Sequence, residues 1–157
     1  MQKYLVLAVL SLATLWGCAS ARMYPVKGPL ASQAPTPVFH AKISAAFYSG
    51  TLSTTLNNGE HFRVPMSPAP TSGAPTHNLS AEWDSVFGPG YYDNRVLPAQ
   101  FHLAGTATGS GGTVLEVELY KNEIRPVPAV KGDENNVRID MAGVAKDSRG
   151  NVYKLTF

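Results

Sequence analysis

The sequence predicts a mainly β protein, either a small antiparallel barrel or a two-sheet sandwich, with about seven strands and one short helix. The 157 residues include 14 Gly and 12 Pro but only 15% charged residues, which favours many turns over long helices. Several short stretches alternate apolar and polar residues, as half-buried strands do. Two C-terminal segments also repeat one strand–turn–strand pattern.

The repeat is the most informative of these observations. Residues 104–114 align without gaps on residues 142–152, and six of the 11 aligned positions are identical. In the second copy, Asp147 can start a type I turn and Gly150 can take the left-handed bulge position. The pattern predicts two similar hairpins. A chance match between two turn-rich segments is the alternative.

The first 17 residues have the pattern of an export signal. Lys3 supplies a positive charge, and the run from Tyr4 to Trp16 is almost wholly apolar. This run is shorter than the roughly 18 apolar residues that indicate a membrane-spanning helix. We therefore treat residues 1–17 as a signal peptide, of helical form, that is not part of the folded domain.

The stretch Leu15-Trp16-Gly17-Cys18 resembles the lipobox of bacterial lipoproteins. Leu15, Gly17 and Cys18 match that motif, whereas Trp16 replaces the small or medium-sized residue that is usual there. The resemblance implies a diacylglyceryl group on the Cys18 thiol, cleavage before Cys18 and acylation of the new amine. One acyl chain binds a membrane only marginally, but three would hold the protein permanently.

The resemblance also implies a location. Ala19 stands where an Asp favours inner-membrane retention in enterobacterial members, so the chain is expected on the periplasmic side of the outer membrane. The alternative is ordinary cleavage after Ala19-Ser20-Ala21, which would release a soluble periplasmic protein. Residues 143–155 and Tyr24-Pro25-Val26 also resemble small uncharacterised lipoproteins of Gram-negative bacteria, a group that implies no activity.

Residues 18–37 are predicted to form an extended tether behind the lipidated cysteine. They contain four prolines and no hydrophobic period. Residues 24–29 could instead dock on the domain as an edge segment. The β-domain is then predicted to span residues 38–157.

The first half of this domain should contain a strand at 38–48 and a hairpin at 50–64. Asn58-Gly59 is a strong hairpin signal, because both central positions of a two-residue turn need positive φ. A long proline-containing loop is predicted for residues 65–78. A short helix at 81–87 follows, with Ser80 as its N-cap. A polar excursion over 122–136 separates the two repeated hairpins.

The segment 83–93 is the candidate binding loop. Its aromatic side chains could stack on an envelope glycan or contact a partner protein, because Trp and Tyr combine apolar area with a polar group. The candidate residues are Trp83, Phe87, Tyr91, Tyr92 and Asp93. Alternatively, Trp83 and Phe87 plug one end of the barrel, and only Tyr91, Tyr92 and Asp93 are exposed.

No catalytic or metal-binding motif stands out, so we predict no cofactor and no metal. The four histidines, His40, His61, His77 and His102, lack metal-ligand spacing. Glu116 and Glu118 should share one solvated strand face. An envelope hydrolase is the alternative, with a site built from dispersed residues, namely His40, His61, His102, Asp84 and Asp93.

Charge and cysteine content limit the partners. Without residues 1–17 the chain has 12 Lys and Arg against 11 Asp and Glu, and the cations form no cluster typical of a nucleic-acid footprint. Cys18 is the only cysteine, so an intrachain disulfide is excluded. The sequence therefore predicts a lipid-anchored, non-enzymatic binding or structural module. Its partners would be the membrane, through the lipid, and an envelope protein or glycan.

Overall fold

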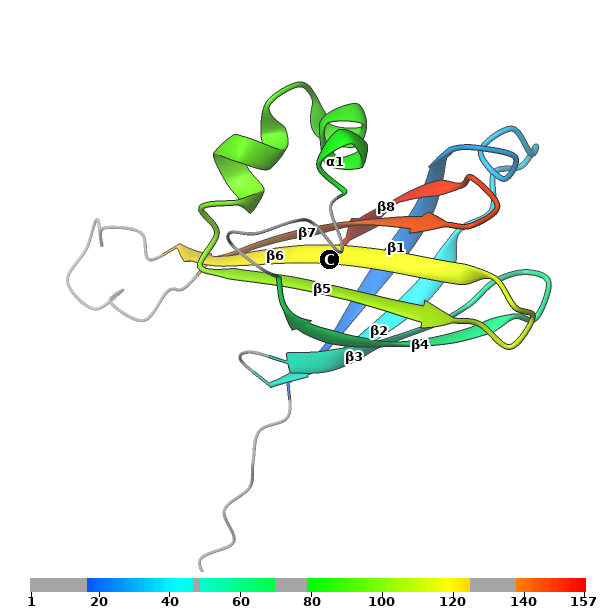
Figure 1. Cartoon of the computed structure of the whole chain (residues 1–157), viewed down its shortest axis with the longest axis horizontal. Coiled ribbons are helices and arrows are strands. Elements are labelled where there is room, and N and C mark those ends of the chain that lie inside the picture. The colour runs from blue at the N-terminus through cyan, green and yellow to red at the C-terminus, as the bar shows by residue number, and fades with distance from the viewer. Residues whose placement is uncertain (1–16, 47–48, 70–78, 125–137) are drawn as a thin grey trace, which may run out of the picture.

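The computed structural model describes residues 17–46, 49–69, 79–124 and 138–157. In this part of the chain, eight antiparallel strands form a closed barrel in sequence order, and the first strand pairs with the last (Figure 1). The strands are β1 (Gly17–Lys27), β2 (Phe39–Ala46), β3 (Ser49–Thr55), β4 (His61–Pro68), β5 (Phe101–Thr108), β6 (Val114–Ile124), β7 (Arg138–Asp147) and β8 (Val152–Thr156). The mainly β fold is confirmed, and the barrel replaces the sandwich alternative.

The eighth strand is β1, which lies where the tether was predicted. It pairs with β2 from Gly17 to Met23 and with β8 from Arg22 to Lys27. A tether over 18–37 is therefore wrong for residues 18–27. The alternative, that residues 24–29 dock on the domain, is correct for residues 24–27, which pair with β8 and not with β2. The physical reason is that Ala21, Met23 and Pro25 alternate inward and are buried. The signal peptide residues 1–16 lie outside the described residues.

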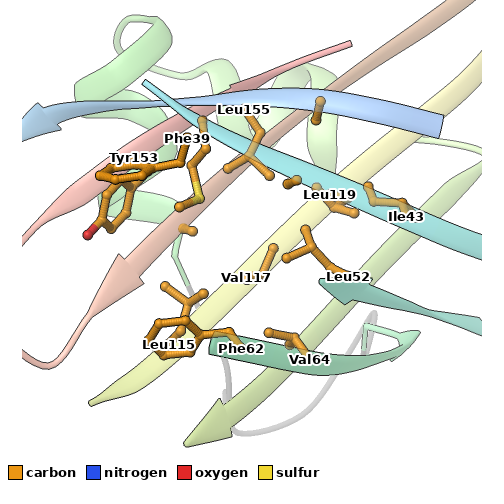
Figure 2. Close-up of a cluster of buried hydrophobic side chains, with 14 of the residues drawn as sticks. Phe39, Ile43, Leu52, Phe62, Val64, Leu115, Val117, Leu119, Tyr153 and Leu155 are labelled. Carbon is orange, nitrogen blue, oxygen red and sulfur yellow. The ribbon is translucent and has the colours of Figure 1, made fainter. Parts of the chain in front are cut away.

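The barrel interior is one apolar core to which all eight strands contribute. Phe39 and Ile43 of β2 face Leu119 and Leu155 across it, and the Tyr153 ring packs edge-on against Phe39 (Figure 2). Alternate residues of each strand point inward, as the pleat requires. Burying this much apolar surface is the main stabilising contribution in a domain without a disulfide.

Three turns at one end of the barrel share the same hydrogen bonds. The first residue of each turn donates its N–H to the carbonyl four residues later: Leu56 to Glu60, Gly109 to Thr113 and Asp147 to Asn151. The fourth position is a glycine with φ of 79°, 86° and 85°, respectively. The two predicted C-terminal hairpins are confirmed as hairpins of one type.

The Asn58-Gly59 turn is a correction. Among the described residues only glycines have positive φ, so Asn58 does not adopt the conformation of a two-residue turn. The hairpin has a three-residue loop with Gly59 at the bulge position instead. Strand β4 also continues to Pro68, beyond the predicted loop start at residue 65.

Glu60 ties the three turns together from a buried position. Its carboxylate accepts hydrogen bonds from Thr113 N–H at 2.9 Å and Oγ1 at 2.8 Å, and from Gly111 N–H at 3.1 Å. Arg149 donates to it from the third turn at 3.1 Å. Burial disfavours the charged carboxylate, but these donors and the amide of Asn58 outweigh that cost and lower the pKa of Glu60.

Outside the barrel lie helix α1 (Ser80–Phe87) and a π-helical turn η1 (Tyr92–Val96), between β4 and β5. Figure 1 shows them over one side of the barrel. Helix α1 agrees with the predicted helix, but its N-cap is Leu79, not Ser80. The reason is a tertiary contact: the Leu79 N–H donates to the carboxylate of Glu118 on β6 at 3.1 Å.

Candidate binding surface

The outer surface of the barrel has two walls of different character. We call the outer face of β5–β8, beneath α1 and η1, the covered wall. We call the outer face of β1–β4 the bare wall. The predicted binding residues lie on the covered wall. The outward-pointing residues of the bare wall were not among the predicted binding residues.

The covered wall buries a carboxylate under an indole. Trp83 is 0% exposed and Glu118 is 1% exposed. The Trp83 Nε1–H donates to Glu118 Oε2 at 2.9 Å, and the N-terminus of α1 donates to Oε1. Glu118 is thus not on a solvated strand face, as its alternation with Glu116 had predicted, because α1 covers that position.

Trp83 is the centre of an aromatic cluster on this wall. Its ring stacks on Phe87 at 5.4 Å and on Tyr91 at 6.0 Å, and it contacts Tyr120 of β6 at 5.7 Å between ring centroids. Tyr91 and Tyr120 join their hydroxyls at 2.8 Å. Burial and the Tyr91 contact raise the pKa of Tyr120. This cluster fastens the helical segment to the barrel.

The predicted loop residues therefore divide. Trp83 has no exposed surface in the described structure, so its side chain cannot itself contact a partner there. Together with Phe87 it packs on the barrel wall, not in a barrel end as the alternative proposed. Phe87, Tyr91 and Tyr92 are partly buried, and Asp93 is exposed. The Lys154 ammonium lies 4.7 Å from the centre of the Phe87 ring.

His102 is buried next to Glu118. The His102 Nε2 atom lies 3.6 Å from Glu118 Oε2, beyond hydrogen-bond distance, and both ring nitrogens lack a hydrogen-bond partner. The Tyr92 ring packs edge-on against the imidazole at 6.1 Å. His102 is thus part of the packing beneath η1, remote from the other described histidines.

The bare wall carries an open groove of about 900 Å³ along β2, β3 and β4. Outward-pointing side chains of the three strands meet there, because paired residues of neighbouring strands share a face. His61 is held by Thr55, whose Oγ1 lies 2.7 Å from the imidazole Nδ1. The residues that give the groove its character are Val38, His40, Lys42, Thr55, His61 and Arg63.

Cations on the bare wall have no carboxylate among them. From Cys18 to Ala81 the sequence holds four basic residues and a single acidic one, Glu60. Glu60 is buried and bonded to the turns. The basic residues are Arg22, Lys27, Lys42 and Arg63, and all four side chains are exposed. Sequence reasoning missed this surface, although the single acidic residue in that stretch was a usable signal.

The structure brings together only some of the residues of the alternative hydrolase site. His40 and His61 line the same groove, on either side of Thr55. Asp84 instead accepts a hydrogen bond from the Tyr92 N–H at 3.0 Å, and backbone donors lower its pKa. Asp93 is exposed on η1 and His102 is buried on β5. No carboxylate lines the groove among the described residues. His77 lies outside the described residues.

Cys18 is the second residue of β1. Its register partner is Ser44 of β2, and Arg22 follows it in the same strand, opposite His40. The described chain thus has no spacer between Cys18 and the barrel ladder. The attachment site predicted from the lipobox therefore lies in the same strand as Arg22, one of the cations of the bare wall.

Comparisons with protein-family models, with curated proteins and with solved structures found no match. Among the described residues, no group of three or more His, Cys, Asp or Glu is placed to hold a metal ion. No helix in that part of the chain is both long and apolar enough to span a membrane.

Proposed function

We propose that this chain is a lipid-anchored, non-enzymatic β-barrel on the periplasmic side of the outer membrane, where its bare wall binds an anionic partner. The lipobox-type stretch supports the anchor. The observation that carries the proposal is that β1 begins at Gly17, one residue before Cys18. Cleavage before Cys18 removes one of the seven residue pairs between β1 and β2. Cleavage after Ala21 removes five of them.

The number of residue pairs that are lost argues against the alternative, a soluble periplasmic form released by cleavage after Ala21. Loss of the first half of β1 would leave the backbone of Ala41 and Ile43 without its ladder partner and would open the barrel core. Unpaired buried backbone groups are costly, and a free strand edge invites aggregation. Cleavage at the lipobox-type site keeps the barrel closed.

An anionic partner follows from the chemistry of the bare wall. Arg22, Lys42 and Arg63 offer charged donors, and hydroxyls such as that of Ser44 add neutral ones. Phosphate and carboxylate groups are the natural acceptors for such a set. A surface of this kind recognises charge and needs no nucleophile or metal.

The intact mass of the native protein tests the anchor. We expect a chain that begins at Cys18 and carries acyl groups, and a Cys18→Ser variant that is no longer processed at that position. Ala21→Leu is the control, because it blocks ordinary cleavage after Ala21 and leaves the lipobox-type stretch unchanged. A native chain that starts at Arg22 without lipid would refute the proposal.

Binding to dextran sulfate, compared with neutral dextran, tests the anionic partner. The lipidated protein in detergent should be retained by the sulfated polymer and released by salt, because the contact is electrostatic. The double variant Lys42→Gln/Arg63→Gln should lose retention. Equal retention of the variant would remove the bare wall as the binding surface.

The hydrolase alternative has one specific observation in its favour. The Thr55 hydroxyl lies 2.7 Å from a histidine nitrogen, which is the distance of a nucleophile–base pair. If this pair acted on an ester or amide, Thr55→Val and His61→Gln would each abolish turnover in the purified protein. Activity that survives both changes, or no activity in the parent, would dismiss the alternative.

A further inference from the structure

The attachment site of the chain lies in the first strand of the bare wall. Cys18 pairs with Ser44, and Arg22 lies four residues further along the same strand. Because a strand rises about 3.3 Å per residue, Arg22 is only about 13 Å from the lipidated residue. Lys42 pairs with Ser20 and is closer still.

The missing spacer limits how far the barrel can move from the bilayer. A flexible tether of n residues would let the domain move away by several ångström times the square root of n. Here the ladder to β2 already includes the lipidated residue. Acyl chains on Cys18 therefore hold the barrel itself at the headgroup layer.

Charge selects which side of the barrel faces that layer. The covered wall presents carboxylates next to its cations, for example Glu82 at 2.6 Å from Lys146. The bare wall presents Arg22, Lys42 and Arg63 with no acidic neighbour on its outer face in the described part of the chain. An anionic surface therefore attracts the bare wall. It attracts the covered wall only weakly, because carboxylates there offset the cations.

We propose that the bare wall lies flat on the anionic phospholipid headgroups of the membrane in which Cys18 is anchored. This inference rests on the proposed function and names the partner of the same surface. The cations of the three strands meet lipid phosphates, and the exposed hydroxyls of Ser20 and Ser44 donate to the same oxygens. The covered wall, with α1, then faces the periplasm.

Three cations at a surface of this kind have a large combined effect. Each Lys or Arg near an anionic leaflet favours contact by about fivefold, so the three together favour it by about two orders of magnitude. The effect should fade at about 0.5 M salt, where the Debye length is only a few ångström. Lipid attachment through Cys18 does not depend on salt, so the two contributions can be separated.

The test is amine labelling of the lipidated full-length mature protein in vesicles. A reagent that cannot cross membranes is applied to protein in vesicles containing phosphatidylglycerol and in vesicles of phosphatidylcholine alone. We expect Lys42 to be labelled at least about tenfold less in the anionic vesicles, given the strength of the combined contact. Lys146 on the covered wall should be labelled equally in both, and high salt should restore the labelling of Lys42.

A charge variant and a matched control sharpen the result. Arg22→Gln/Arg63→Gln keeps Lys42 as the reporter and should remove its protection. Arg95→Gln, an exposed residue of η1, should leave the protection intact. Circular dichroism of each variant checks that the barrel is folded.

The outcomes separate the inference from the proposed function. Equal labelling of Lys42 in both vesicles overturns the membrane contact, and it indicates a barrel that stands upright on its anchor. If dextran sulfate protects Lys42 while anionic vesicles do not, the partner is an anionic polymer, and only the inference fails. An unacylated native chain would instead remove the proposed function.

Discussion

Both walls of this barrel are formed by strands whose residues alternate inward and outward, but the outward residues of the two walls differ. On β6–β8 the outward positions hold Tyr120, Ala142 and Val144, which are buried by α1 and η1. On β2–β4 the outward positions hold hydroxyls, imidazoles and cations, which stay open to the surroundings. The difference teaches that the aromatic segment covers the apolar outward positions, whereas the polar outward positions stay exposed in the described structure.

Trp83→Ala should have the largest effect on stability. Its removal empties the centre of the covered wall, and large-to-small core substitutions of aromatic residues cost about 3–5 kcal/mol. Arg63→Ala on the bare wall should change the free energy of unfolding by no more than about 0.5 kcal/mol. Urea denaturation of both variants measures the comparison. Equal losses would mean that the two walls do not differ as described.

Glu118→Ala should have the next largest effect. It leaves the Trp83 indole N–H and the Leu79 N–H without an acceptor beneath α1, and an unsatisfied buried donor costs about 1–3 kcal/mol. Glu116→Ala is the matched control, because it lies on the same strand and the same face but is only half-buried. Thermal unfolding of the two variants decides the matter, and a control as damaging as Glu118→Ala would contradict the assignment.

Much of the barrel could be predicted from the sequence, but the strand β1 that closes it could not. Glycine-containing turns and alternation predicted the strands of both C-terminal hairpins. Strand β1 was missed because Pro25 and the neighbouring signal peptide hid the inward alternation of Ala21 and Met23. Only the pairing of β1 with both β2 and β8 shows that the segment belongs to the barrel.

The arrangement of the candidate site residues could not be predicted for a related reason. An aromatic run such as 83–93 looks the same in a sequence whether it covers a wall or contacts a partner. The placement of His40 and His61 in one groove depends on strand register across β3, which no local pattern encodes. The clustering of carboxylates away from β1–β4, in contrast, was already present in the sequence.

Acid should destabilise the end of the barrel where Glu60 holds the three turns together. The folded-state pKa of Glu60 is below its ordinary value of 4.5, so its contribution to stability is fully present above that value. That contribution is lost as pH falls through the lowered pKa. Melting temperatures measured across this acidic range should therefore fall more steeply for the parent than for Glu60→Gln. Parallel curves would show that the charge of Glu60 does not support the turns.

The smallest expected change concerns the bare wall alone. Arg22→Gln/Arg63→Gln should leave the free energy of unfolding within about 0.5 kcal/mol of the parent, because both side chains are exposed and no ion pair is formed by them in the described structure. Denaturant titration of the unlabelled protein measures it. A loss of several kcal/mol would mean that these cations stabilise the barrel and are not available to a partner.

The most direct test of the account is the distance of each wall from the bilayer. Because Cys18 is the only cysteine and is acylated in the proposed protein, Thr55→Cys and Ser85→Cys each provide a single thiol for a fluorophore. Thr55 lies on the bare wall, four residues along β3 from the strand position nearest Cys18, and Ser85 lies on α1; both side chains are exposed. In anionic vesicles with a quencher on the headgroups, we expect strong quenching at position 55 and little at position 85. Equal quenching at the two positions, or stronger quenching at position 85, would contradict the account.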